Sequence, residues 1–140
     1  LTDLLVSIVS DCDFDNSTFC GWENDKSTRA KFTWVIWSGS TPSVTTGPQS
    51  DVSGNGKYAY MEATGRQHGD NVRLISPVMQ GPKCFSMMYH MYGAHMGSLI
   101  IYTKINSSET VEWIKTGNHP DQWLEAAVFF NSSVDYQVID

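Results

Sequence analysis

Short segments in which apolar and polar residues alternate recur along the whole chain, and they constrain its fold more than any other feature. Alternation with a period of two gives a β-strand one apolar face, whereas an amphipathic helix needs apolar residues three and four positions apart. No window carries that helical stripe, and Gly, Pro, Asn and Ser separate the segments. The strands expected on this basis are 32–37, 58–63, 72–76, 84–92, 98–105, 111–115, 123–130 and 134–139.

Many short strands at regular spacing predict an all-β fold. The expected architecture is an antiparallel two-sheet β-sandwich with jelly-roll topology. The longest expected strand alternates clearly, so its apolar face should point into the core; the residues on that face are Phe85, Met87, Tyr89 and Met91.

The charge balance argues against nucleic acid as a partner. The chain has nine Lys and Arg against fifteen Asp and Glu, a net charge of −6. Phosphate binding needs clustered cations, which this composition does not supply. A run of about 18 apolar residues, the length needed for a membrane-spanning helix, is also missing from the sequence. We therefore expect neither nucleic-acid binding nor direct insertion into a membrane.

The sequence carries no catalytic signature. It lacks a G-x-S-x-G nucleophile elbow, a phosphate-binding P-loop and the short motif that surrounds a protease cysteine. Its scattered carboxylates cannot be paired into a glycosidase dyad from sequence, since such a dyad is defined by spatial separation. The expectation is that the chain is not an enzyme.

Three cysteines leave an odd thiol. An odd count is compatible with reduced thiols in the cytosol, with an intermolecular bridge, or with a partner outside this sequence. Three N-glycosylation patterns begin at Asn16, Asn106 and Asn131. Together with the low content of charged residues and the short Cys12–Cys20 spacing, they favour a secreted or cell-surface domain.

Acidic residues near the N-terminus indicate a candidate calcium site. Asp11, Asp13 and Asp15 alternate, so an extended chain would place their carboxylates on one face, where a hard cation would relieve their repulsion. The proposed ligands come from Asp13, Asp15, Asp51 and Ser53, the last at the start of a Gly-rich loop. The alternative is that these are solvated turn residues and that Asp51 caps a tight turn.

Two tryptophans lie where expected strands meet loops. Trp22 follows a glycine and Trp37 precedes Ser-Gly-Ser. Either indole is a candidate contact for a protein partner or a stacking platform for a sugar. Packing beneath a loop is the other interpretation of both positions.

Several segments, in their order along the chain, resemble the MAM domain. This extracellular module is named for meprin, a neuropilin antigen and the mu-type receptor tyrosine phosphatase. The matching segments are Cys12-Asp13-Phe14-Asp15, Phe19-Cys20-Gly21-Trp22, Phe32-Thr33-Trp34, Thr46-Gly47-Pro48, Gly54-Asn55-Gly56-Lys57-Tyr58, Arg73-Leu74-Ile75-Ser76-Pro77, the run from Cys84 to Gly93, Trp123, and Tyr136-Gln137-Val138.

The resemblance implies one jelly-roll domain over residues 12–140, preceded at 1–11 by a linker or leading strand. Family members usually have four cysteines, so the resemblance implies a Cys12–Cys20 disulfide and leaves Cys84 unpaired here. It also implies that the terminal strand of the family, which carries the fourth cysteine, is missing from these residues.

The resemblance further implies a non-catalytic adhesion or recognition module in the extracellular part of a larger cell-surface or secreted protein. Its partner would be a protein, with a homophilic contact as one form. Two alternatives remain open: a carbohydrate-binding, lectin-like module, and an accessory domain of an extracellular protease or receptor phosphatase.

Overall fold

The computed structural model describes residues 7–8, 12–27 and 30–139, and these form strands and loops without a helix. No segment of the described chain could therefore cross a membrane as a helix. The strands are β1 (Ser7–Ile8), β2 (Glu23–Asn24), β3 (Val35–Ser38), β4 (Lys57–Tyr60), β5 (Leu74–Ile75), β6 (Lys83–Tyr89), β7 (Ser98–Ile105), β8 (Ser108–Thr116), β9 (Leu124–Phe130) and β10 (Gln137–Ile139).

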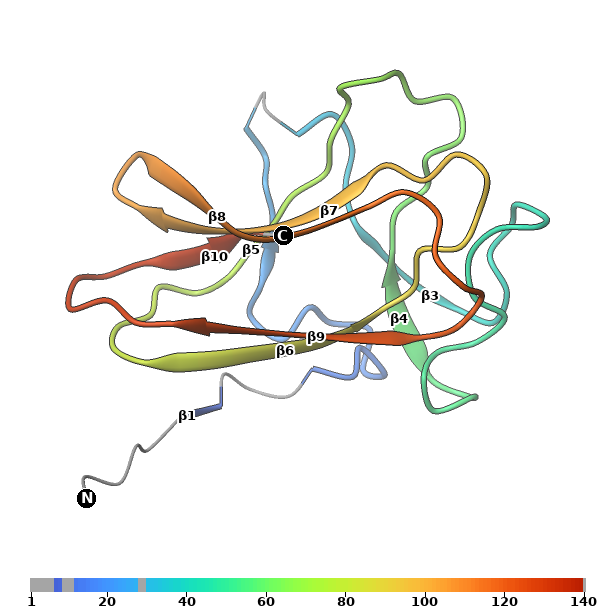
Figure 1. The fold of residues 1–140 in the computed structure, drawn as a ribbon. Helices are drawn as coiled ribbons and strands as arrows, with labels where there is room; N and C mark the ends of the chain where they lie inside the picture. The colour runs from blue at the N-terminus through green and yellow to red at the C-terminus, as the bar shows by residue number, and fades with distance from the viewer. Residues whose placement is uncertain (1–6, 9–11, 28–29, 140) are drawn as a thin grey trace.

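The strands form two stacked sheets, which Figure 1 shows as an upper and a lower layer. One sheet has the order β2-β5-β10-β7-β8, and the other has the order β1-β6-β9. All pairs are antiparallel except the short pairing of β1 with β6, so the expected all-β antiparallel sandwich is confirmed. One feature was not expected. Strands β3 and β4 pair only with each other and form a separate two-stranded sheet.

Two adjoining clusters of side chains fill the space between the larger sheets. The buried residues of the first are Ile101, Phe130, Tyr136 and Val138, and those of the second are Tyr89, Met91 and Ala126. Met87 and Trp113 pack against both clusters and join them into one core. The apolar face predicted for β6 does point inward, and each large side chain buried there contributes about 1.5–3 kcal/mol.

Most predicted strands exist, with altered ends. Residues 98–105 are a strand at the predicted bounds, and β8 is longer than its prediction of 111–115. It is longer because a two-residue turn at Asn106-Ser107 joins β7 directly to β8, with Asn106 in the left-handed conformation at φ 54°. β2 was not predicted, since two residues carry no recognisable alternation.

The predicted strand at 32–37 is wrong in its first half, because Trp34 is held by a side chain instead of a neighbouring strand. The Asn24 amide accepts a hydrogen bond from the Trp34 backbone N–H at 2.7 Å and donates one to the Trp34 carbonyl at 3.1 Å. The amide thus imitates one step of a β-ladder. It ties the entry of β3 to β2 at the edge of the five-stranded sheet.

Replacing Asn24 should therefore loosen this connection. We expect Asn24→Ala to lower the free energy of unfolding by about 1–3 kcal/mol, because two backbone groups lose their partner. Urea denaturation would measure the loss. Asn71→Ala is the control, since Asn71 is exposed and its side chain bonds to no described residue. Equal stability of the two variants would contradict the bridging role of Asn24.

Candidate functional site

A disulfide closes the loop that precedes β2. Cys12 and Cys20 are joined, as the family resemblance implies, with their Cα atoms 5.8 Å apart. Within the loop, the rings of Phe14 and Phe19 pack edge to face with centroids 6.1 Å apart. The small loop is thus fixed by a covalent bond and by a contact between two aromatic rings.

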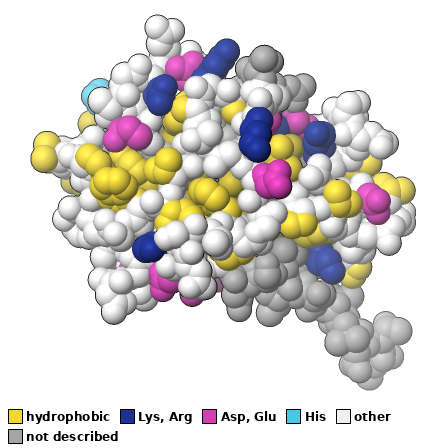
Figure 2. Space-filling model, turned by 180° about the vertical axis from the view of Figure 1, so that it is seen from behind, with side chains coloured by type: hydrophobic (Ala, Val, Ile, Leu, Met, Phe, Trp, Pro, Cys, Tyr) yellow, Lys and Arg dark blue, Asp and Glu magenta, His cyan; other side chains and the backbone are white. Residues whose placement is uncertain are grey.

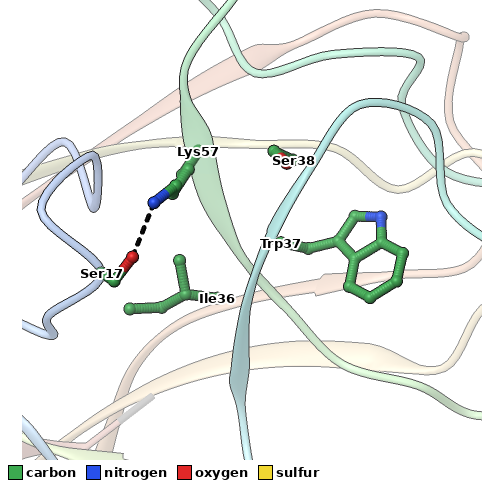
Figure 3. A pocket seen from close by; sticks show the side chains of 5 residues that line it. All are labelled: Ser17, Ile36, Trp37, Ser38 and Lys57. Atoms are coloured by element: carbon green, nitrogen blue, oxygen red, sulfur yellow. Dashed lines mark hydrogen bonds between the residues drawn. The ribbon is translucent and has the colours of Figure 1, made fainter.

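The disulfide loop contacts the start of β4 through Lys57. The backbone N–H of Lys57 donates to the Asp15 carboxylate at 2.7 Å, and its ammonium donates to the Ser17 hydroxyl at 2.6 Å. Residues about forty positions apart thereby become neighbours. Figure 3 shows the pocket beside this contact, of about 210 Å³, where Ser17, Ile36 and Lys57 lie on one side of β3.

Asp51 organises the loop before β4. One carboxylate oxygen accepts the backbone N–H groups of Gly54 and Gly56 at 3.0 and 2.7 Å, and the other accepts the N–H and hydroxyl of Ser53 at 2.9 and 2.6 Å. Asp51 is buried, so these four donors compensate the loss of water around a charged group. These contacts are those of a residue that caps a tight turn, which is the alternative interpretation of Asp51 given by the sequence.

These donors also set the proton affinity of Asp51. The Ser53 hydroxyl has the largest effect, and with the backbone N–H groups it holds the pKa of the carboxyl below its usual value, although burial acts in the opposite direction. The carboxylate is therefore charged in the folded protein at neutral pH.

Asp15 and Asp51 converge on Gly56. A Cβ atom at Gly56 would lie 2.5 Å from one oxygen of Asp15 and 2.8 Å from one oxygen of Asp51, so a larger residue here would force the carboxylates to move. Oxygens of two carboxylates thus lie near one position, and the Ser53 hydroxyl donates to one of them. Asp13 is exposed and caps the backbone N–H of Asp15, and Asp11 lies outside the described residues.

The donor chemistry fits calcium, although few side chains take part. Among the described residues, no three side chains of Asp, Glu, His or Cys gather in one place. Calcium takes six to eight oxygens, so a cation here would rely on backbone carbonyls and water as well as on the two carboxylates. It would also compete with the donors that already surround Asp51.

The Trp37 side chain points to the side of β3 opposite those of Ser17, Ile36 and Lys57, although Trp37 also lines the pocket (Figure 3). Its ring is 38% exposed and packs against Tyr60, with centroids 6.0 Å apart. The indole N–H donates to the Ser40 carbonyl at 3.0 Å, which fixes the orientation of the ring. Trp37 is therefore an exposed aromatic side chain that is already ordered.

Two residues extend this surface, and the sequence analysis did not identify them. Val35, 42% exposed, lies directly opposite Tyr60 in the β3–β4 register, and opposite residues share a face. Val35, Trp37 and Tyr60 together form what we call the β3–β4 patch. In Figure 2, hydrophobic side chains gather most densely toward the side of the molecule that carries these strands. The sequence alone could place Val35 and Trp37 on one face of a strand, because they are two positions apart. Only the pairing of β3 with β4 shows that Tyr60 lies on the same face.

An acidic group stands at the border of the patch. The Tyr60 hydroxyl donates to Glu62 at 2.6 Å, and the Thr64 backbone N–H donates to the same carboxylate at 2.8 Å. Burial, together with the adjacent Glu62, raises the pKa of Tyr60, so its hydroxyl stays protonated. Hydrogen bonds from Thr64 and Tyr60 lower the pKa of Glu62, which is therefore a stable negative charge.

The remaining candidate residues are dispersed. Trp22 is half-buried, with its ring 5.6 Å from Phe85, and it packs against the first core cluster. Cys84 is half-buried on β6 and forms no disulfide with another described residue. The three glycosylation candidates Asn16, Asn106 and Asn131 are all exposed. The structure thus brings Asp15, Asp51 and Ser53 together and separates the two tryptophans.

Comparison with known proteins identifies one family and several relatives. The family described as MAM domain, meprin/A5/mu, matches residues 12–139. Neuropilin-1a of Danio rerio is 37% identical, over 91% of this chain and 15% of its own length. Human neuropilin-1 is 34% identical, over 91% and 14% respectively. The MAM domain-containing glycosylphosphatidylinositol anchor protein 1 of Gallus gallus is 34% identical, over 91% and 15%. The chain thus spans about one seventh of these relatives.

The lowered pKa of Asp51 predicts how stability depends on pH. Its contribution is complete above about pH 4, where an unfolded Asp is ionised, and is lost as the pH falls through the lower pKa of the folded state. We expect Asp51→Asn to cost about 2 kcal/mol near neutral pH, because charged hydrogen bonds are lost.

This cost should shrink on acidification below about pH 4, because the wild-type protein then loses the same charge. Denaturant unfolding near pH 7 and near pH 3 would measure both values. Asp135→Asn is the matched control, since Asp135 is exposed and bonds to no described residue. A cost that is unchanged at low pH would show that the charge of Asp51 is not what stabilises the loop.

Proposed function

The chain belongs to the MAM domain family, and from this membership we propose that it is a non-catalytic extracellular recognition module that binds a protein through the β3–β4 patch. The family is shared with neuropilins and with a glycosylphosphatidylinositol anchor protein. We propose the same extracellular setting for this chain. Its disulfide and its three exposed glycosylation patterns support that location, because both belong to the secretory pathway.

The observation that carries the proposal is the exposed, ordered ring of Trp37. Binding energy in protein interfaces concentrates on a few residues, among which Trp and Tyr are enriched. The hydrogen bond to Ser40 and the contact with Tyr60 restrict the indole before a partner arrives, so little conformational entropy remains to be lost. Trp22 packs against the core, so we assign the partner contact to Trp37.

The border of the patch supports recognition of a partner with a cationic group. Glu62 is held in its ionised form beside Tyr60, and the chain as a whole has a net charge of −6. Charges at the edge of an interface chiefly govern encounter rate and specificity. A basic side chain at the rim of an apolar partner surface would complement this arrangement. A second copy of the chain or a different protein could present such a surface.

Substitution of Trp37 tests the patch. We expect Trp37→Ala to weaken partner binding by about 30-fold or more, the effect of losing an interface hot spot. The partner would be identified by proximity labelling on cells that display the natural polypeptide, and affinity would be measured by surface plasmon resonance. Phe129→Ala is the control, because Phe129 is a similarly exposed aromatic residue on β9. Equal affinities for the two variants would contradict the assignment.

The same variants distinguish protein recognition from lectin activity. A glycan array probed with the wild-type domain and with Trp37→Ala should show no dependence on Trp37 if the patch binds protein. Sugar binding that disappears with Trp37, accompanied by unchanged protein binding, would favour the carbohydrate-binding alternative instead. Catalytic activity of a parent polypeptide would come from residues outside this module.

We also propose that calcium binds between Asp15 and Asp51. The specific support is that oxygens of both carboxylates lie within 3 Å of one position beside Gly56. Extracellular calcium modules bind in the range of about 10⁻⁴–10⁻³ M, and a site with only two carboxylates belongs there. An ion here would connect the disulfide loop to the loop before β4.

Calcium titration of metal-free protein tests this site. We expect heat of binding in calorimetry and a rise in melting temperature at millimolar calcium, because the ion binds the folded state. Asp15→Asn should abolish both, since the amide oxygen can still accept from Lys57 but the charge is gone. Asp135→Asn should leave both unchanged. Absence of heat and of any thermal shift at millimolar calcium would disprove the site.

A further inference from the structure

Two glycosylation patterns that are distant in sequence lie at one end of the sandwich. Asn106 is in the turn that joins β7 to β8, and Asn131 directly follows β9. A pocket of about 310 Å³ is lined both by Ile105, the residue before Asn106, and by Asn131 and Ser132. Figure 1 shows the same arrangement: the β7–β8 turn and the turn after β9 project at one end, with β3 and β4 at the other.

This pocket lies between two strands, β8 and β9, that are sheet edges in the described part of the chain. β8 is the last strand of the five-stranded sheet and β9 is the last strand of the three-stranded sheet. Side chains from β7, β8 and β9 line the space between them, including Thr103, Glu112 and Phe129. No described strand covers either edge.

Open edges of this length invite pairing with other chains. β8 has nine residues, and a long edge strand presents unpaired N–H and C=O groups. Apolar side chains accompany these edges, since Val111, Ile114 and Phe129 are each 53% exposed. Such an edge needs protection if the protein is to remain separate at high local concentration.

We propose that Asn106 and Asn131 both carry N-linked glycans and that the two glycans together cover this open end between β8 and β9. Both asparagines are exposed, as are Ser108 and Ser133, the hydroxyl residues that complete their patterns. Glycans are bulky and hydrated, so a pair on opposite sides of the opening blocks the approach of another strand without filling the core.

The second pattern is also fixed in position relative to the sheets. The Gly81 backbone N–H donates to the Ser132 carbonyl at 2.9 Å, and the Gln80 side-chain amide donates to the Ser133 carbonyl at 3.3 Å. Asn106 is fixed by its hairpin turn. The attachment points therefore hold their places on the two sheets, and the glycans extend from a defined site.

The modification is a group transfer from a lipid-linked oligosaccharyl pyrophosphate of the secretory pathway. The side-chain amide nitrogen of each asparagine forms a bond to C1 of the first sugar. The bond between C1 and the pyrophosphate oxygen breaks, and the lipid pyrophosphate leaves with that electron pair. The amide nitrogen releases one proton, and no oxidation or reduction takes place.

Glycans at these positions leave the β3–β4 patch accessible. The third pattern, which begins at Asn16, is not part of the inference, since its middle residue, Ser17, lines the same pocket as Trp37 (Figure 3). The inference rests on the extracellular location proposed above, but it is independent of which partner binds the patch. Glycosylation then directs recognition toward one end of the domain by closing the other.

Removal of the hydroxyl groups of Ser108 and Ser133, which the two glycosylation patterns require, tests the inference. The natural polypeptide would be produced in secretory cells as wild type, as Ser108→Ala/Ser133→Ala and as Ser107→Ala. The double variant loses both patterns while keeping both asparagines and the backbone carbonyl that Gln80 contacts. Ser107→Ala is the matched control, because its pattern stays intact. Glycopeptide mass spectrometry would give site occupancy, and light scattering with size-exclusion chromatography would give association.

We expect glycans at both sites in the wild type and the control. The double variant should form at least several-fold more associated material, with added amide-exchange protection in β8, because a second chain would then pair with that edge. An unmodified Asn106 or Asn131 in secreted wild type would overturn the inference, as would unchanged association in the double variant. Partner binding that depends on Trp37 should persist in the double variant, so failure of the β3–β4 assignment would be recognised separately.

Discussion

The insertion of β10 between β5 and β7 is the interaction on which the rest of the fold depends. Val138 is fully buried, and its backbone N–H donates to the Ser76 hydroxyl across 62 sequence positions at 2.8 Å. The Ser76 backbone N–H donates back to the Val138 carbonyl, and the side-chain amide of Gln137 donates to the Ser76 carbonyl. Without β10, the five-stranded sheet would separate into a β2–β5 pair and a β7–β8 hairpin. The core clusters would then have no continuous wall.

This dependence on distant partners explains which parts of the fold could be predicted from sequence. Residues 98–105 were predicted at their true bounds because their own alternation and their turn determine them. Residues 32–34 were predicted as strand and are not, because Asn24, about ten positions earlier, takes the place of a pairing strand. A single amide carries no periodic signal. The separate β3–β4 sheet was not predicted for a similar reason. Which sheet a strand joins depends on the strand that it pairs with, whereas alternation in the sequence shows only which side chains share a face.

The candidate sites also combine features that local sequence predicts with features that only distant contacts determine. Asp51 and Trp37 were identified individually, from residue type and neighbouring glycine or serine, and the alternative of a turn cap describes the contacts of Asp51. The joint geometry was not predictable, since Asp15 reaches Gly56 only through the folded disulfide loop. Likewise, Tyr60 joins Trp37 only through strand register. Sequence therefore supplied the chemical groups, and tertiary structure decided which of them act together.

The disulfide loop makes one part of the structure depend on the redox conditions around the protein. Phe14, Ser17 and Cys20 all have positive φ, a conformation that costs non-glycine residues about 1–2 kcal/mol each. The covalent link between the loop ends helps to maintain these conformations, and Asp15 and Ser17 hold Lys57 at the start of β4 only from this arrangement. Reduction of that bond would therefore weaken the contact of the loop with the start of β4, while the hydrogen bonds between Asn24 and Trp34 would still hold the entry of β3. The contact between the disulfide loop and β4 thus depends on oxidation, so a chain that has not passed through an oxidising compartment would lack this covalent support.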